Sequence, residues 1–268
     1  MKQYIIATVA ETVRLAEGIY STTVIAPEIV KFAMPGQFVC VYTDDCAHLL
    51  PRPISICDID RSTGALRLVY RVVGFGTDEL SKKGAGASVR LLGPIGTGYE
   101  SVAEGKERPV RILIGGGIGI PPMLLLAKEW SKAGYEVHAV LGYRNAELFL
   151  RDDFAPYATC YIATDDGSVG THGTVLDAIR AEKLIPSGAE ERTLFAACGP
   201  MPMLRGIAGA AKELGIPAYI SLEERMACGV GACLGCIVKS RETDSHSHVN
   251  NKRICTEGPV FEVNQLCL

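Results

Sequence analysis

The sequence predicts an antiparallel β-barrel, then an α/β domain with a parallel sheet, then a small cysteine-rich domain. Three observations predict this order. Short alternating segments fill the first hundred residues, strands and helices alternate up to about residue 222, and the remainder is rich in glycine and cysteine. These patterns are typical of barrels or sandwiches, of parallel sheets with crossover helices, and of metal-binding modules. We therefore expect domains at 1–103, 104–222 and 223–268.

The composition narrows the class of protein. Of 268 residues, 48% are hydrophobic and 21% charged, with a net charge of −3, and no basic cluster suggests nucleic acid as a partner. The longest apolar stretch, 112–127, is shorter than a membrane span and is interrupted by glycines and prolines. Polar residues break the N-terminal apolar run too early for a secretory signal. We expect a cytoplasmic protein without a membrane partner.

The first part reads as closely spaced strands with one short helix. Apolar and polar residues alternate between turn residues, with no helical pattern between most of the segments. A single short helix is expected at 78–86. The expected strands lie within 4–26, 35–43, 52–60, 64–73 and 87–96.

The second part alternates strands with helices, the pattern of parallel strands joined by crossover helices. The expected strands lie within 110–116, 135–144, 158–167, 192–200 and 216–224. The expected helices lie within 121–134, 173–182 and 201–215. Past residue 224 neither pattern continues. The last part is too small to build its own hydrophobic core, so its stability must come from another source.

The cysteine spacing is the most specific motif. Cys228, Cys233, Cys236 and Cys255 are spaced C-x4-C-x2-C-x18-C, and the first three match the plant-type ferredoxin run that binds a 2Fe-2S cluster. Intervening glycines allow positive φ angles and bring backbone N–H groups against the sulfurs. These glycines are Gly229, Gly231 and Gly235.

Other interpretations of the cysteines fit less well. Structural zinc prefers two C-x2-C pairs, and the sequence has one. A Rieske site needs histidine paired with cysteine, whereas His246 and His248 lie in a polar loop with no neighbouring cysteine. Five further cysteines lack ligand spacing and are assigned no function: Cys40, Cys46, Cys57, Cys160 and Cys267.

A glycine-rich turn follows the first strand of the α/β part. Gly115, Gly116, Gly117 and Gly119 precede two prolines suited to a helix start, and the third glycine of G-x-G-x-x-G is replaced by Ile120. A plain strand-to-helix turn remains an alternative. A second strand, however, runs into the turn Cys198-Gly199-Pro200 at the same carboxyl edge, where α/β sheets bind ligands.

A proline–arginine turn is the third motif. Pro51 and Pro53 fix φ on both sides of Arg52, so the guanidinium can face a phosphate with the Ser55 hydroxyl nearby. The alternative is an edge strand with an exposed arginine. Arg71 and a turn at Gly76-Thr77, expected just before the short helix, favour the anion-binding interpretation.

The order of these motifs resembles the ferredoxin reductase superfamily, and within it the electron-transfer subunits of B-type dihydroorotate dehydrogenase. The resemblance covers essentially the whole chain, and the C-terminal motif is its most discriminating part. The motifs are RPIS (52–55), VYR (69–71), GFGT (74–77), GGGIGIPP (115–122), TDDGSVG (164–170), ACGP (197–200) and SLEERMACGVGACLGC (221–236).

The resemblance implies sites for three groups. It implies FAD at Arg52, Pro53, Ile54, Ser55, Val69, Tyr70, Arg71, Gly76 and Thr77. It implies NAD at Gly115, Gly116, Gly117, Gly119, Ile120, Cys198, Gly199 and Pro200. It implies cluster ligation by Cys228, Cys233, Cys236 and Cys255, with Cys267 as the alternative fourth ligand because the preceding polar loop is long.

The implied function is an electron relay without catalytic acid–base residues. Electrons from the FMN of a separate catalytic subunit, in a heterotetramer of two chains of each kind, would pass through the 2Fe-2S cluster and FAD to NAD in pyrimidine biosynthesis. NAD over NADP rests on the resemblance, because Glu136 precedes the second parallel strand. Two alternatives remain: an NAD(P)H-dependent FAD and iron–sulfur reductase serving a hydrogenase, sulfide or ferredoxin-linked partner, and a zinc-stabilised nucleotide-binding regulator.

Overall fold

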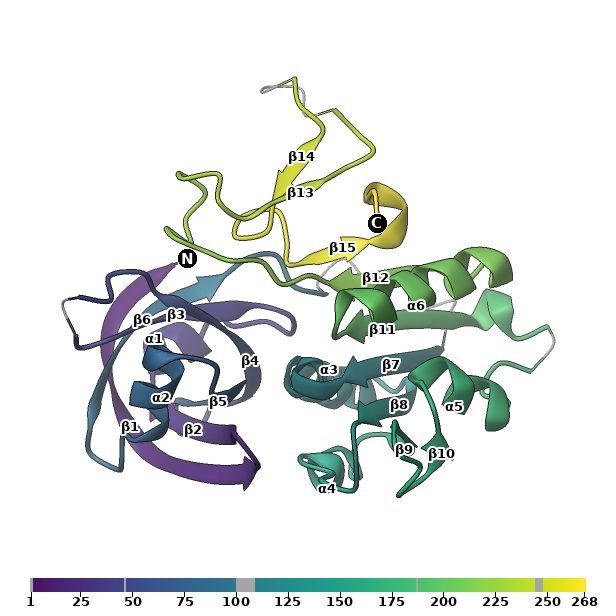
Figure 1. The fold of residues 1–268 in the computed structure, drawn as a ribbon, viewed down its shortest axis with the longest axis horizontal. Helices are drawn as coiled ribbons and strands as arrows, with labels where there is room; N and C mark the ends of the chain where they lie inside the picture. Colours follow the sequence, from purple (N-terminus) through teal and green to yellow (C-terminus); the bar gives the residue numbers. More distant parts are fainter. Residues whose placement is uncertain (1, 46, 100–108, 187, 244–247) are drawn as a thin grey trace.

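The computed structural model describes residues 2–45, 47–99, 109–186, 188–243 and 248–268. A barrel, drawn in purple and blue in Figure 1, lies beside an open sheet with helices, drawn in teal and green. The yellow C-terminal segment lies across the top of both parts (Figure 1). The three-part fold class predicted from the sequence is confirmed.

Six antiparallel strands of the described chain close into the barrel in the order β1-β2-β5-β4-β3-β6. Alternate side chains, among them Val9, Val24 and Leu68, fill its interior, as the period of the sequence predicts. A closed barrel has no edge strand, so the edge-strand alternative for the segment beginning at Arg52 is wrong. The strands are β1 (Gln3–Ala16), β2 (Ile19–Ile25), β3 (Phe38–Tyr42), β4 (Arg52–Asp60), β5 (Ala65–Arg71) and β6 (Ser88–Ile95).

Among the residues that the structure describes, the barrel carries two helices where the sequence predicts one. The short α1 (Pro27–Val30) begins at a proline, which suits the first helical position, and four residues are too few to show a helical period. The second helix, α2 (Phe75–Ser81), begins three residues before the predicted start. The hydroxyl of Thr77 accepts the backbone N–H of Val73 at 3.0 Å and so closes this end. Gly76 and Thr77 therefore lie inside the first helical turn, and the prediction of a turn there is wrong.

The α/β part contains seven strands among the described residues, in the order β10-β9-β8-β7-β11-β12-β15. All neighbours are parallel except β12 and β15. The central β7 is buried along almost its whole length, as a sheet covered on both faces requires. The strands are β7 (Val110–Gly116), β8 (Glu136–Tyr143), β9 (Thr159–Thr164), β10 (Thr171–His172), β11 (Thr193–Cys198), β12 (Ala218–Ser221) and β15 (Val260–Glu262).

Helices cover both faces of this sheet. They are α3 (Pro121–Lys132), α4 (Arg151–Phe154), α5 (Val175–Ala181) and α6 (Met201–Leu214), with short 3-10 turns η2 (Gly117–Gly119), η3 (Glu190–Arg192) and η4 (Val263–Gln265). Figure 1 shows α3 between the barrel and β7. Half-buried ion pairs cross this contact, Lys128 with Asp58 and Arg67 with Asp153. The barrel and the sheet are therefore held against each other by α3 and α4.

The C-terminal segment is built from short pieces attached to the other two parts. Strands β13 (Ile237–Lys239) and β14 (Asn251–Arg253) pair only with each other in the described chain. By contrast β15 completes the large sheet, and Pro259 bridges to Thr97 just after β6. The predicted domain boundary at 103/104 lies outside the described residues. The boundary at 222/223 is followed by a segment that returns to the large sheet through β15. Both boundaries stay predictions. No helix of the described chain is long and apolar enough to cross a membrane.

Candidate cofactor and nucleotide site

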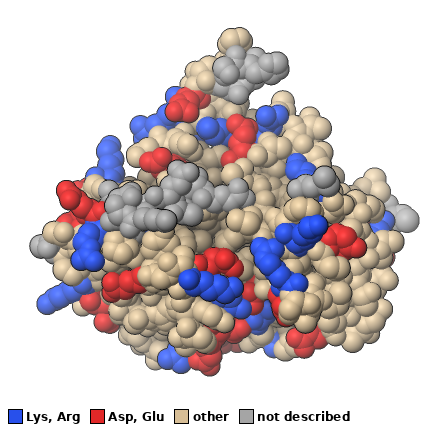
Figure 2. Space-filling model, turned by 180° about the vertical axis from the view of Figure 1, so that it is seen from behind, with Lys and Arg blue, Asp and Glu red and all other residues tan. Residues whose placement is uncertain are grey.

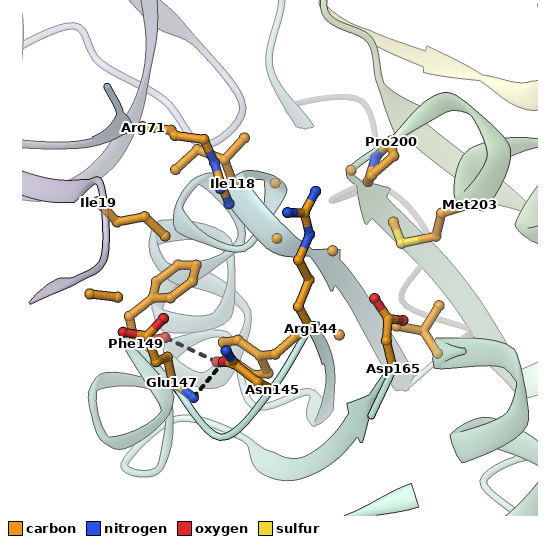
Figure 3. Close-up of a pocket in the computed structure, with 18 of the residues that line it drawn as sticks. Ile19, Arg71, Ile118, Arg144, Asn145, Glu147, Phe149, Asp165, Pro200 and Met203 are labelled. Atoms are coloured by element: carbon orange, nitrogen blue, oxygen red, sulfur yellow. Dashed lines mark hydrogen bonds between the residues drawn. The ribbon is translucent and has the colours of Figure 1, made fainter. Parts of the chain in front are cut away.

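A recess of about 700 Å³ lies between the barrel and the carboxyl edge of the sheet. Its walls come from the ends of β1 and β5 on the barrel side and from η2 and the turns after β8, β9 and β11 on the sheet side. Figure 3 shows side chains from both parts facing the same space. Since open α/β sheets bind ligands at this edge, the recess is the natural place for a nucleotide.

The glycine turn forms the floor of the recess. Gly117 takes φ of +53° and has open space around it, which leaves its backbone accessible to a ligand. A Cβ at Gly116 would come within 2.5 Å of the Met203 sulfur, so this glycine lets the start of helix α6 (Met201–Leu214) pack closely against the glycine turn. Helix α3 begins at Pro121, as the sequence predicts.

Most residues expected for NAD line the recess, and three do not. Gly116, Gly117, Gly119, Gly199 and Pro200 are on its surface. The other three, Gly115, Ile120 and Cys198, lie behind the turn. Gly115 packs on the backbone of Ile120. Ile120 is fully buried and Cys198 is 1% exposed, so neither side chain faces the recess.

The turn after β11 carries a buried thiol. Burial, reinforced by the nearby Glu223 carboxylate, raises the pKa of Cys198 well above its usual range, so this thiol is uncharged at neutral pH. Glu223 lines the recess, and desolvation raises the pKa of its carboxyl. The sequence interpretation gave Glu223 no role, although it stands in the SLEERM motif.

Two arginines enter the recess from opposite parts. Arg71, at the end of β5, and Arg144, directly after β8, extend toward the glycine turn in Figure 3. Arg71 was expected from the sequence, and Arg144 was not. The signal that could have identified Arg144 is its position one residue past the second parallel strand, where such sheets read the ribose of a dinucleotide.

Two of the barrel motifs meet although they are far apart in the sequence. The Arg52 guanidinium lies against Gly76 so closely that any side chain at this glycine would overlap it. The same guanidinium donates to the carbonyl of Leu50. The motifs at 52–55 and 69–71 lie on the neighbouring strands β4 and β5, and 74–77 follows directly. The structure therefore gathers all three at one region of the barrel.

Several residues expected for FAD are barrel core. Arg52, Pro53, Ser55 and Arg71 are partly exposed. In contrast, the Tyr70 side chain is 2% exposed and its hydroxyl lies 2.9 Å from that of Thr22. The other buried members of the expected set are Ile54, Val69, Gly76 and Thr77.

The cysteine loop bends around its own thiols. The Cys228 sulfur accepts the backbone N–H of Val230, and the Cys233 sulfur that of Gly235, each at 3.4 Å. Gly229 and Gly231 have φ of +67° and +91°, as predicted. Gly235 does not have positive φ; its neighbour Leu234 takes that conformation at +56°, so the prediction for Gly235 is wrong.

The four thiols influence one another in two pairs: the ionisation of Cys228 depends on Cys233, and that of Cys255 depends on Cys236. Partial burial opposes ionisation of Cys228, but hydrogen bonds from the loop backbone outweigh it and lower its pKa to about 6. Burial and the Cys236 thiol raise the pKa of Cys255 to about 12. The loop thus combines one readily formed thiolate, Cys228, with one thiol, Cys255, that ionises when a metal compensates its charge.

This donor set fits a two-iron cluster. A 2Fe-2S cluster takes four thiolates, two to each iron, and the loop supplies four thiols at Cys228, Cys233, Cys236 and Cys255. Cys255 lies beside Cys236, while the backbone N–H of Cys267 bonds to Lys239 at the far end of β13. This geometry favours Cys255 over Cys267. Two residues weighed in the sequence, Cys46 and His246, lie outside the described residues.

One cysteine without ligand spacing lies next to the loop. Cys40 on β3 is fully buried, opposite Pro53 of β4, and a Cβ added to Gly229 would come within 2.8 Å of its sulfur. Burial, followed by the nearby charges of Cys255 and Cys228, raises its pKa to about 12. Nothing in the local sequence around Cys40 could indicate this contact, because the cysteine loop is nearly 200 residues away.

Comparison with known proteins gives concordant results. The iron–sulfur cluster binding domain of dihydroorotate dehydrogenase B matches residues 223–267. The chain is 39% identical over 259 residues to the electron transfer subunit of dihydroorotate dehydrogenase B (NAD(+)) from Fusobacterium nucleatum, covering 95% of each chain. The corresponding subunit of Bacillus caldolyticus is 41% identical over 267 residues, covering 97% of each.

Two solved structures are similar in fold. An NADH-dependent reduced ferredoxin-NADP oxidoreductase is 30% identical with a TM-score of 0.83, covering 97% of this chain and 89% of the other. A ferredoxin NADP+ reductase from Neisseria gonorrhoeae, with bound FAD and NADP, is 16% identical with a TM-score of 0.68, covering 83% and 94%. The chain belongs to the family of electron transfer subunits of NAD-dependent dihydroorotate dehydrogenase B.

Proposed function

We propose that this chain relays electrons from the FMN of a dihydroorotate dehydrogenase catalytic subunit to NAD+, as a step of pyrimidine biosynthesis. Its resident groups would be FAD in the barrel and a 2Fe-2S cluster on the cysteine loop. When bound, the flavin exchanges single electrons with the cluster and a hydride with NAD. The observation that carries the proposal is the recess, which brings the glycine turn and the barrel arginine Arg71 to one space.

For the dinucleotide, the chain supplies backbone and charge. The open turn at Gly117 lets the pyrophosphate approach main-chain N–H groups, and Arg144 adds a cation on the same side. The Gly199-Pro200 turn borders the recess where β11 neighbours β7. The nicotinamide would lie there, facing the barrel.

For the flavin, the chain supplies an arginine held in place by a glycine. Arg52 packs on Gly76 and bonds to Leu50, so its guanidinium is oriented before any ligand arrives. A fixed guanidinium suits a phosphate because less side-chain entropy is lost on binding. Ser55, on the same strand, adds a hydroxyl.

For the cluster, the chain supplies four thiols as ligands and a surrounding loop whose backbone N–H groups donate to the sulfurs. Cys233 is exposed, and three apolar side chains near it in the sequence, Val230, Leu234 and Ile237, are exposed as well. An exposed apolar patch around a redox site is typical of a protein interface. We place the catalytic subunit there, in a heterotetramer with two chains of each kind.

A second candidate function keeps the same sites and changes the partner. The likeness to the NADH-dependent reduced ferredoxin-NADP oxidoreductase favours a reductase serving another acceptor. Higher identity to the dihydroorotate dehydrogenase subunits, 39% and 41% over at least 95% of both chains, favours the first proposal. A zinc-stabilised regulator without redox activity is the third candidate, and purified protein would then lack both flavin and iron–sulfur absorption.

The test is reconstitution with a partner. The chain, loaded anaerobically with FAD, iron and sulfide, is mixed with an FMN-containing dihydroorotate dehydrogenase B catalytic subunit, and NADH formation from dihydroorotate is followed. We expect a stable complex and NAD-dependent turnover. A chain that carries flavin and cluster but neither binds this subunit nor confers NAD-dependent turnover supports the second candidate and contradicts the first.

A further inference from the structure

We infer that the hydroxyl of Thr256 donates a hydrogen bond to a sulfide of the bound 2Fe-2S cluster and so raises the reduction potential of the cluster. The inference rests on the proposed function, because it concerns the same cluster. Thr256 directly follows the ligand Cys255, but neither the sequence motifs nor the proposed relay assigns it a role. It acts on the cluster without ligating iron.

The Thr256 side chain packs against the middle of the cysteine loop. A Cβ added to Gly231, which stands between the first two ligands, would come within 2.7 Å of the Thr256 methyl carbon and 3.6 Å of its hydroxyl oxygen. Burial is the main cause that raises the pKa of Cys255, and the Gly231 backbone N–H opposes this rise. The same glycine is therefore close to the Thr256 side chain and to the fourth ligand.

The Thr256 hydroxyl is a buried polar group that still needs a partner. Its oxygen is inaccessible to solvent and, among the residues that the structure describes, has no hydrogen-bond partner, the cysteine sulfurs included. A buried hydroxyl left in this state destabilises a folded protein, and such groups in native structures usually point to a missing partner. The sulfides that arrive with the cluster are acceptors of the required kind.

The backbone acceptors around Thr256 are already engaged. Threonine hydroxyls often donate to a carbonyl three or four residues earlier in the chain. Here the Arg253 carbonyl accepts the backbone N–H groups of Thr256 at 3.2 Å and of Glu257 at 2.8 Å. The Gly231 carbonyl accepts the Arg253 guanidinium at 3.4 Å. Local bonds to the backbone thus do not account for the buried hydroxyl.

The turn that carries Thr256 is fixed to the barrel. The Thr256 carbonyl accepts the Thr97 hydroxyl at 3.3 Å, and the Thr97 N–H donates to the Gly258 carbonyl at 2.5 Å. Thr97 stands just after β6, so the hydroxyl is held from a rigid part of the molecule. A donor positioned in advance loses little entropy when the cluster binds.

A hydrogen bond to a cluster sulfur favours the reduced form. Reduction adds one electron, so the negative charge on the sulfurs grows and the donor is attracted more strongly. Hydrogen bonds to the sulfurs are one of the factors that set the potential of an iron–sulfur cluster. Thr256 thereby makes the cluster a better acceptor of electrons from the partner.

The test measures the reduction potential of the cluster in the chain loaded with FAD, iron and sulfide. The electron paramagnetic resonance signal of the reduced cluster is recorded at a series of fixed potentials. Thr256→Val keeps the shape of threonine and loses the hydroxyl, whereas Thr256→Ser keeps the hydroxyl and loses the methyl group. We expect Thr256→Val to shift the equilibrium about tenfold toward the oxidised form, which lowers a one-electron potential by about 59 mV. Thr256→Ser should stay near wild type.

A matched control lies in the same segment. Thr243 is exposed and its hydroxyl lies 2.7 Å from the Asn250 side-chain oxygen, so Thr243→Val makes the same chemical change away from the thiols. It should leave the potential unchanged. Electron–nuclear double resonance in H2O and D2O gives a second readout: one exchangeable proton coupled to the reduced cluster should be missing in Thr256→Val and present in Thr256→Ser.

A second pair of variants covers poor assembly. If Thr256→Val binds too little cluster to measure, Thr256→Ala is compared with Thr256→Ser, because these two differ only in the hydroxyl. Equal potentials within that pair, or in Thr256→Val and wild type, would show that the inference is wrong while the proposed function stands. A wild-type chain that binds no 2Fe-2S cluster would contradict both.

Discussion

The C-terminal cysteine segment and the two larger parts of the molecule are held together differently. The barrel and the sheet each enclose apolar side chains from many elements, such as Leu66 and Leu68 in one and Ile112 and Leu113 in the other. In the C-terminal segment, the buried residues join cores that belong mostly to the other parts: Cys236, Ile254 and Cys255 pack in one cluster with Phe38 and Ile95 of the barrel. In the view from behind, Lys, Arg, Asp and Glu side chains lie near the top of the molecule, where the C-terminal segment is (Figure 2).

The seam between the segment and the barrel depends on close backbone contact. A Cβ on Gly96 would come within 2.5 Å of the Gly258 carbonyl, and the Thr97 N–H donates to that same carbonyl at 2.5 Å. Small segments without a core of their own usually need a metal or a disulfide. The comparison teaches that burial of their own apolar side chains stabilises the two large parts. Thiol ligation and contacts with the other two parts stabilise the C-terminal segment.

The largest expected effect comes from removing an exposed ligand. Cys233→Ala should abolish the visible and electron paramagnetic resonance signals of the cluster and reduce electron transfer to the partner by more than the roughly 10- to 100-fold that loss of a supporting contact costs. Reduction of bound FAD by NADH should continue at the wild-type rate, because the recess is untouched.

The matched control is Cys267→Ala, which removes another exposed cysteine outside the thiol pairs. Its cluster should be intact. Survival of the cluster in Cys233→Ala, or its loss in Cys267→Ala, would contradict the ligand set.

The next largest effect concerns the barrel. Arg52→Ala should weaken FAD binding by about 10- to 100-fold, the range of hydrogen bonds to charged groups, as measured by flavin retention during dialysis. Cluster content should not change, since Arg52 lies in the barrel motif and not in the cysteine loop. Arg14→Ala, an exposed arginine on β1, is the control, and equal flavin retention in both variants would reject the role of Arg52.

The contact between the cysteine loop and the barrel can be tested with one methyl group. Gly229→Ala places a Cβ 2.8 Å from the Cys40 sulfur on a residue with φ of +67°, a backbone conformation that costs about 1–3 kcal/mol for other residues. We expect less than about half of the normal cluster content after reconstitution, measured as iron and sulfide per chain.

Adding Cys40→Ala to this variant removes the clash but not the backbone strain, so it should restore part of the cluster content. Gly84→Ala, which meets no atom within 4 Å, should have no effect. If the double variant has no more cluster than Gly229→Ala, the contact between Gly229 and Cys40 does not limit cluster assembly.

The smallest effect concerns the contact between barrel and sheet. Lys128→Ala leaves the largely buried Asp58 carboxylate unpaired, and because the side chains of this pair are 21% and 18% exposed, we expect a loss of about 2 kcal/mol in the free energy of unfolding. Lys132→Ala on the same helix removes a 68% exposed partner and should cost less than about 1 kcal/mol. Denaturant unfolding followed by circular dichroism measures both, and equal losses would contradict the argument.

Parts of the site could be predicted because short motifs carry them. The C-x4-C-x2-C spacing indicated a cluster, and the strand running into Gly115 indicated a nucleotide turn, since both depend on residues that are neighbours in the chain. Contacts between distant segments could not be predicted this way. Arg52 against Gly76, Cys40 against Gly229, and Arg144 with Asp165 in one recess all depend on how strands pair.

Helix boundaries were less predictable than the succession of strands and helices along the chain. The sequence placed the barrel helix at 78–86, whereas Thr77 begins it early by capping two backbone N–H groups. It gave positive φ to Gly235, whereas Leu234 takes that conformation. The first difference is local, because the Thr77 hydroxyl satisfies backbone N–H groups that are free at the start of a helix. The second arises because a residue other than glycine can occasionally take the left-handed conformation.

By itself, then, the sequence determined the order of the parts, the thiol spacing and the turns that approach phosphates, because periodicity and spacing are local properties of a chain. The tertiary structure alone decided which expected residues face a ligand and which, such as Tyr70, Ile120 and Cys198, are core. It also decided that β15 returns to complete the nucleotide sheet. The physical reason is that burial and strand pairing are set by the packing of the whole chain, which no short segment encodes.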